Sequence, residues 1–145
     1  DEAAAVASAF LAPGLVVTYE DGTGRHRELG AEAQPGDQGT PLVVLVDDAT
    51  ASAAEVVAAA LRDRGRAVIV GTTTYGKGSV QAVTALTGGG AVELTIGRWY
   101  PPSGRGVDGT GIAPDIPVAP ADPPETADAR AREVLGGLVS ASKAA

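Results

Sequence analysis

Residues 42–70 constrain the fold more than any other part of the sequence. They begin with a continuous apolar run, Leu42–Val46, which is typical of a strand buried on both faces. Residues 53–64 have the composition of a helix that Gly65 ends, and a second apolar run follows at Ala67–Val70. A strand, a helix and a strand this close together predict a right-handed crossover between two parallel strands. The sequence therefore predicts an α/β fold.

The segments on either side predict shorter elements. Helices are expected near both ends of the chain, over residues 2–11 and 125–140. Two antiparallel hairpins are expected between them, with arms at residues 15–19, 25–29, 80–86 and 91–96. In the second hairpin three alternating apolar residues are expected to point inward: Val92, Leu94 and Ile96.

Length and charge narrow the classes of function. The chain has 145 residues and a formal net charge of −7, so we expect one domain or a piece of one. The negative charge argues against nucleic acids and anionic membranes as partners, because both are themselves negatively charged. With no cysteine and one histidine, the sequence excludes a disulfide and a cysteine nucleophile, and we expect no metal site.

Ser52 stands where the first apolar strand passes into the helix. One interpretation is structural, because Ser52 and Glu55 fit the capping-box pattern. The other is catalytic, because a serine at such a turn projects its hydroxyl at the carboxyl edge of a sheet, where crevices form. Backbone N–H groups at the start of the helix, that of Ala53 among them, can then face a developing oxyanion.

Lys77 is the unusual basic residue of the chain. The eleven basic residues include only two lysines, Lys77 and Lys143, and Lys143 is close to the C-terminus. As a general base Lys77 must be neutral, so its ordinary pKa of about 10.4 has to fall, which burial without an acidic partner achieves. No Asp or Glu lies between residues 64 and 92, and Gly76 and Gly78 allow close backbone approach. We therefore expect Lys77 to be the uncharged base for Ser52.

Two other functions remain open from the residues alone. Gly71–Lys77 matches seven positions of a phosphate-binding P-loop, although Gly78 replaces the Ser or Thr that holds magnesium, so the chain could be a nucleotide-binding module. It could also be a non-catalytic polypeptide-binding domain in which Ser52 only caps the helix. His26, in a charged hairpin arm, is expected to be solvated, and Asp47-Asp48 are expected to be turn residues.

Three segments in order carry a family resemblance: residues 41–71, then TYGKGSVQ at 74–81, then RWYPPSGRGVDGTGIAPDI at 98–116. Together they resemble the C-terminal processing peptidases, also called tail-specific proteases. The resemblance implies a serine endopeptidase with a Ser–Lys dyad on a ClpP/crotonase-like α/β core, with a mixed sheet, flanking helices and a β-hairpin. It implies that residues 1–120 are the C-terminal part of this core and that residues 121–145 are a helical tail.

The same resemblance implies roles for four residues. Ser52 is the nucleophile, Lys77 the base, Gln81 the residue that orients Lys77, and the Ala53 N–H an oxyanion donor. The Ser-Ala-Ser-Ala-Ser-Glu pattern of the family is Thr-Ala-Ser-Ala-Ala-Glu here, which keeps the reactive serine three residues before the glutamate.

The resemblance also implies the biological setting. The substrates are proteins or peptides with exposed C-termini, cleaved near that end through an acyl-enzyme without a cofactor. It places the protein in the bacterial cell envelope, periplasmic or on the outer face of the membrane, and is compatible with a homo-oligomer. The PDZ domain of the family and a glycine turn of its oxyanion hole would precede Asp1, so we expect this chain alone to be weakly active or inactive.

Overall fold

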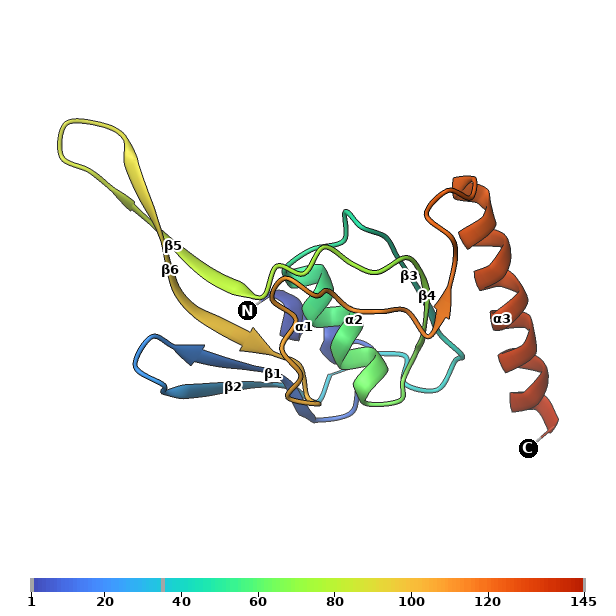
Figure 1. Ribbon diagram of the computed structural model, residues 1–145. Coiled ribbons are helices and arrows are strands. Elements are labelled where there is room, and N and C mark those ends of the chain that lie inside the picture. The colour runs from blue at the N-terminus through green and yellow to red at the C-terminus, as the bar shows by residue number, and fades with distance from the viewer. Residues whose placement is uncertain (1, 35, 145) are drawn as a thin grey trace.

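The structure is a computed structural model that describes residues 2–34 and 36–144 (Figure 1). Its central unit has three strands and one helix: β3 (Val43–Val46), α2 (Ala53–Asp63), β4 (Val68–Gly71) and β7 (Ile116–Pro117). The strand order is β3-β4-β7, and both pairings are parallel. The predicted crossover from β3 through α2 to β4 is therefore confirmed.

The remaining strands form a four-stranded antiparallel sheet. They are β1 (Gly14–Asp21), β2 (His26–Ala31), β5 (Ser79–Ala85) and β6 (Ala91–Tyr100), in the order β2-β1-β6-β5. Both predicted hairpins are present, and β6 joins them because its last residues pair with β1. The family resemblance implies parallel and antiparallel pairing in one mixed sheet. Both kinds of pairing occur, but in the described residues the parallel pairs form one sheet and the antiparallel pairs form the other.

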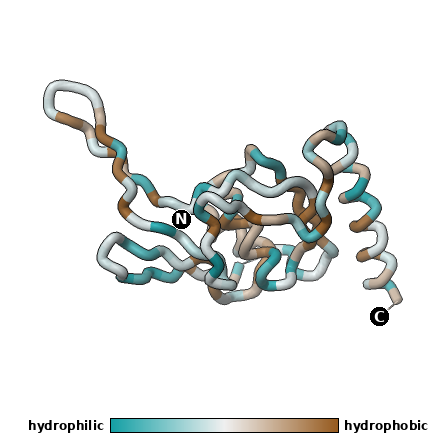
Figure 2. The backbone as a smooth tube through the Cα atoms, in the orientation of Figure 1, coloured by the Kyte–Doolittle hydropathy of each residue, from teal (hydrophilic) through white to brown (hydrophobic). Residues whose placement is uncertain are grey.

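Helices cover the small parallel sheet from two sides. On one side, α1 (Glu2–Ser8) packs against α2, and the core between them and the sheets is built from small apolar side chains, among them Ala7, Val16, Ala59 and Ile69. On the other side α3 (Pro124–Ala144) contacts β3 and β4. Figure 2 shows that hydrophobic residues gather where these two strands run. No helix in the described ranges combines the length and apolar character that a membrane crossing requires.

Two predictions of buried apolar side chains are wrong. Val92, Leu94 and Ile96 are 37%, 58% and 50% exposed, because the β5–β6 hairpin projects beyond the part of β6 that pairs with β1 (Figure 1). Leu45 is 48% exposed, because β3 is an edge strand of its sheet. An apolar pattern shows which face of a strand could be buried, whereas actual burial depends on what packs against that face.

A substitution at Gly71, the last residue of β4, tests how tightly β4 packs against β3. Its φ is +138°, and a Cβ built there lies 1.8 Å from the Val46 carbonyl oxygen of the neighbouring strand. We expect Gly71→Ala to lower the free energy of unfolding in urea by about 2–4 kcal/mol, from backbone strain and overpacking together. Gly22→Ala is the control, because no atom lies within 4 Å of its added Cβ. Equal stability of the two variants would contradict this packing.

Candidate active site

The turn between β3 and α2 holds Ser52 in an unusual conformation. Its φ is +53° and its ψ is −118°, and it is the only non-glycine residue in the described ranges with a positive φ. Such backbone strain is uncommon and gathers at functional turns, where it re-aims a side chain. Ser52 is also the N-cap residue of α2, and its N–H donates to Glu55 Oε2 as in the predicted capping box. Its position at the helix start leaves the catalytic interpretation open.

A fully buried carboxylate, that of Glu55, connects this turn to residues 72–78 between β4 and β5, the Lys77 loop. Glu55 Oε2 accepts the N–H of Ser52 at 2.8 Å and the N–H of Lys77 at 2.9 Å. Glu55 Oε1 accepts the N–H of Gly76 at 2.8 Å and the hydroxyl of Thr74 at 2.5 Å. The glutamate of the predicted capping box therefore fixes the backbone of both members of the predicted dyad.

Trp99 holds the Lys77 loop from the opposite side. Its indole N–H donates to the Lys77 carbonyl oxygen at 2.8 Å, and its backbone N–H donates to the Gly78 carbonyl oxygen at 3.0 Å. The Trp99 side chain is buried, with the residue only 3% exposed. The Lys77 backbone is thus bound through its N–H by Glu55 and through its carbonyl by Trp99.

The two glycines that flank Lys77 permit close approach to the segment after β6. A Cβ at Gly76 would lie 2.7 Å from the backbone nitrogen of Gly111, and one at Gly78 would lie 2.6 Å from that of Asp108. The Gly78 N–H also donates to Asp108 Oδ1 at 3.2 Å. The prediction that these glycines bring backbone close to the lysine loop is confirmed.

The predicted site residues all line one cleft of about 330 Å³. They are the four residues to which the sequence analysis gave roles: Ser52, Ala53, Lys77 and Gln81. Within the described ranges no hydrogen bond joins the Lys77 amine to the Ser52 hydroxyl, and catalytic contacts are often looser when no substrate is bound. The tertiary structure therefore brings the predicted nucleophile, base, orienting residue and oxyanion donor to one place.

Comparison with known proteins identifies the family of this chain. The sequence model described as "Peptidase family S41" matches residues 1–118, which is most of the chain. This chain belongs to peptidase family S41.

Individual relatives agree with this assignment. A carboxy-terminal-processing protease of Bartonella bacilliformis is 42% identical over 120 residues, which cover 81% of this chain and 27% of that protein. The chloroplastic carboxyl-terminal-processing peptidase 3 of Arabidopsis thaliana is 49% identical over 76 residues, or 52% of this chain and 15% of that protein.

A solved structure confirms the fold. The photosystem II D1 C-terminal processing protease is 38% identical, with a TM-score of 0.75 over 82% of this chain and 31% of that chain. The predicted ClpP/crotonase-like α/β core is therefore correct. The S41 chain described here spans less than a third of the length of each of these three relatives.

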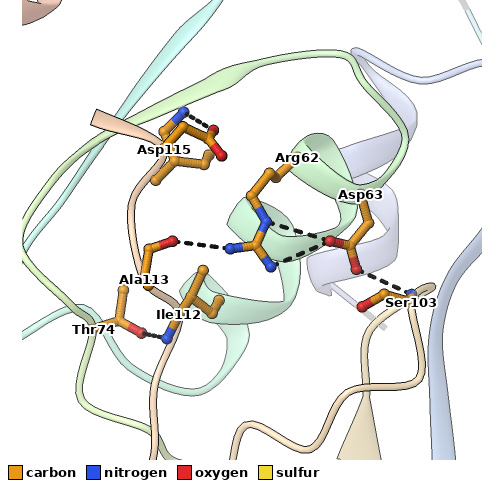
Figure 3. Close-up of polar contacts among 8 residues, drawn as sticks. Arg62, Asp63, Thr74, Ser103, Ile112, Ala113 and Asp115 are labelled. Carbon is orange, nitrogen blue, oxygen red and sulfur yellow. Dashed lines mark hydrogen bonds and ion pairs between the residues drawn. The ribbon is translucent and has the colours of Figure 1, made fainter. Parts of the chain in front are cut away.

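Residues 98–116, the third segment that carries the family resemblance, are hydrogen-bonded to the elements around the cleft. This segment runs from β6 to β7, and hydrogen bonds attach it to α2 and to the Lys77 loop (Figure 3). Three of these bonds are Ile112 N–H to Thr74 Oγ1 at 2.7 Å, Arg62 Nη1 to the Ala113 carbonyl oxygen at 2.9 Å, and Ser103 N–H to Asp63 Oδ2 at 3.0 Å. Thr74 thus donates to Glu55 and accepts from this segment.

The P-loop interpretation of Gly71–Lys77 does not fit the structure. The Tyr75 N–H donates to the Thr50 carbonyl oxygen at 2.9 Å, and the Gly76 and Lys77 N–H groups donate to Glu55. The donors that a P-loop aims at phosphate are therefore occupied by the protein itself, and β5 follows where a P-loop has a helix.

The other sequence candidates lie outside the cleft. His26 is exposed on its hairpin, with Nε2 at 3.7 Å from Glu20 Oε2, as expected of a solvated residue. Asp47 accepts the Thr50 N–H at 2.9 Å, as expected of a turn residue. Nowhere in residues 2–34 and 36–144 do three His, Cys, Asp or Glu side chains gather as metal ligands would.

Two residues of the cleft wall were missed by the sequence analysis. Tyr19 comes from β1, and burial raises the pKa of its phenol, so the phenol stays neutral at physiological pH. Glu93 comes from β6 and follows directly on the acid-free stretch that favoured Lys77 as base. The pairing of the predicted hairpin was the available signal, because it places Glu93 near Gln81.

Glu55→Gln tests the connection between the two loops. Glutamine has nearly the shape of glutamate, but its NH₂ group replaces one carboxylate oxygen. Each oxygen of Glu55 accepts two hydrogen bonds, so the NH₂ group faces two donors in either orientation and leaves them unpaired in the interior. We expect the free energy of unfolding to fall by about 2–5 kcal/mol, measured by urea denaturation. Glu28→Gln on exposed β2 is the matched control and should change little. Equal effects of both substitutions would show that the buried carboxylate has no special role.

Proposed function

We propose that this S41 chain contributes the Ser–Lys dyad of a serine endopeptidase that cleaves proteins near their C-termini. One observation carries the proposal: the Glu55 carboxylate binds the N–H groups of both Ser52 and Lys77, while the side chains of both residues line one cleft. A serine in a strained turn and a lysine that lines the same cleft are the two components that nucleophilic catalysis needs.

The reaction begins when the neutral amine of Lys77 takes the proton of the Ser52 hydroxyl. The oxygen attacks the carbonyl carbon of the scissile peptide bond, and the developing oxyanion accepts the N–H of Ala53. Within the described residues this N–H donates to no protein group, so it is available to substrate. Protonated Lys77 then gives its proton to the departing amine, which leaves an acyl-enzyme.

Deacylation repeats these steps with water. Lys77, neutral again, takes a proton from a water molecule whose oxygen attacks the acyl carbon, and the proton returns to Ser52 as the ester bond breaks. We assign Gln81 to orient the Lys77 amine through its side-chain amide, because Gln81 lines the same cleft from β5. The reaction written in this way uses no cofactor.

The wider setting is part of the same proposal. We assign residues 1–120 to the C-terminal part of the peptidase core and residues 121–145 to a helical tail, in keeping with the family match that ends at residue 118. The substrates are polypeptides with exposed C-termini. We propose the bacterial cell envelope as the location, on the ground that the family resemblance suggests it and that the relatives include bacterial proteins.

Substitution of the dyad tests the proposal. In the complete protein, Ser52→Ala and Lys77→Arg should each lower kcat/KM for C-terminal tail peptides by about 10³-fold or more, measured by mass spectrometry, since arginine keeps the charge but cannot act as a base. Urea denaturation of each variant separates loss of activity from loss of folding.

A chemical rescue provides the matched control. This chain has no cysteine, so in Lys77→Cys the introduced thiol is the only one it contains. Alkylation with 2-bromoethylamine restores an amine of nearly the length of lysine, and we expect activity to return. Full activity of Ser52→Ala, or of Lys77→Arg, would contradict the dyad, whereas a complete protein that binds unfolded polypeptide and never cleaves it would favour a polypeptide-binding role.

A further inference from the structure

The cleft contains an acidic residue that the proposed reaction does not use. Glu93 lines it together with Ser52 and Lys77, and no hydrogen bond or ion pair of its carboxylate is present among the described residues. An exposed carboxylate on the wall of a cleft, without a partner in its own chain, is available to a bound molecule. Its position next to the dyad makes the substrate the candidate partner.

The pairing of β5 and β6 shows how Glu93 reaches the site. Gln81 lies opposite Thr95, and Val83 lies opposite Glu93. Because side chains alternate with a period of two, Gln81 and Glu93 fall on the same face of the hairpin as diagonal neighbours, roughly 7–8 Å apart. The opposite face carries Val92, Leu94 and Ile96.

The charge of the cleft wall depends on very few groups. Three of its residues can titrate: Tyr19, Lys77 and Glu93. Burial raises the pKa of Tyr19, which keeps its phenol neutral. Glu93 is therefore the only negatively charged side chain of the wall, so a basic side chain of a substrate finds an opposite charge beside it.

We propose that Glu93 selects substrates that carry a lysine or arginine close to the scissile bond. This inference rests on the proposed peptidase function and names a specificity-determining residue for it. A basic side chain beside Glu93 gains an ion pair, whereas an acidic one meets a like charge. Because Glu93 lines the same cleft as Ser52, the selected side chain lies within a few residues of the bond that is cleaved.

An alternative role for Glu93 is to hold Lys77 charged. No ion pair within 4 Å joins these two side chains in the part of the chain that the structure describes. Contact with substrate is therefore favoured, and the experiment below separates the two roles. A carboxylate that acts on Lys77 affects every substrate alike, whereas one that contacts substrate discriminates by charge.

The test is a charge scan with the complete protein. Denatured casein is digested, and one peptide that the wild type cleaves is resynthesised with Lys, Gln or Glu at each of three positions on either side of the scissile bond. At one position we expect kcat/KM for Lys to exceed that for Glu by about 10-fold, the size expected of an exposed ion pair together with the opposing repulsion. In Glu93→Gln the ratio should fall to within about twofold, and in Glu93→Lys it should reverse. Glu28→Gln, on exposed β2, should keep the wild-type ratio.

Each outcome decides between the hypotheses. An unchanged Lys-to-Glu ratio in Glu93→Gln overturns the inference, and so does a uniform rise in cleavage of all peptides, which would assign Glu93 to Lys77. A wild type that cleaves without any charge preference also overturns it, while leaving the peptidase function intact. If the wild type cleaves nothing, or Ser52→Ala cleaves equally well, the proposed function itself fails and this inference fails with it.

Discussion

The buried carboxylate of Glu55 is the interaction on which the site depends. A charge in a protein interior is tolerated only when its hydrogen-bonding capacity is filled, and here each carboxylate oxygen accepts two donors. Those donors come from the turn before α2 and from the loop between β4 and β5. The two loops therefore cannot shift independently without leaving part of the carboxylate unpaired, and Ser52 and Lys77 keep their relative positions.

The same interaction explains why a P-loop-like sequence occurs in a chain of this family. Successive backbone N–H groups in a glycine-containing loop form a concave site for an anion. In nucleotide-binding proteins the anion is a phosphate, whereas here the Glu55 carboxylate, 22 residues before Lys77, occupies that place. The local sequence pattern reports the shape of the loop, and the tertiary contact determines which anion fills it.

The cleft combines rigid and projecting parts of the molecule. Ser52 and Lys77 lie on loops of the packed core, and Trp99, buried at the base of the hairpin, binds the lysine loop. Gln81 and Glu93 lie farther out, on a two-stranded ribbon that projects from the core. The ribbon thus carries both the residue assigned to orient Lys77, Gln81, and the residue assigned to select substrate, Glu93, whereas the nucleophile and the base lie on the core.

The sequence by itself determined the α/β crossover, both hairpins, the turn that holds Ser52 and the glycines around Lys77. All of these follow from local hydrophobic periodicity and from backbone preferences within a few residues. Only the tertiary structure decided what each face meets. Leu94 is exposed because its hairpin projects from the core, and Leu45 because β3 is an edge strand. Glu93 reaches the cleft through strand register, and Glu55 joins loops far apart in sequence. Burial and long-range hydrogen bonds depend on which distant segments come together, and no local pattern contains that information.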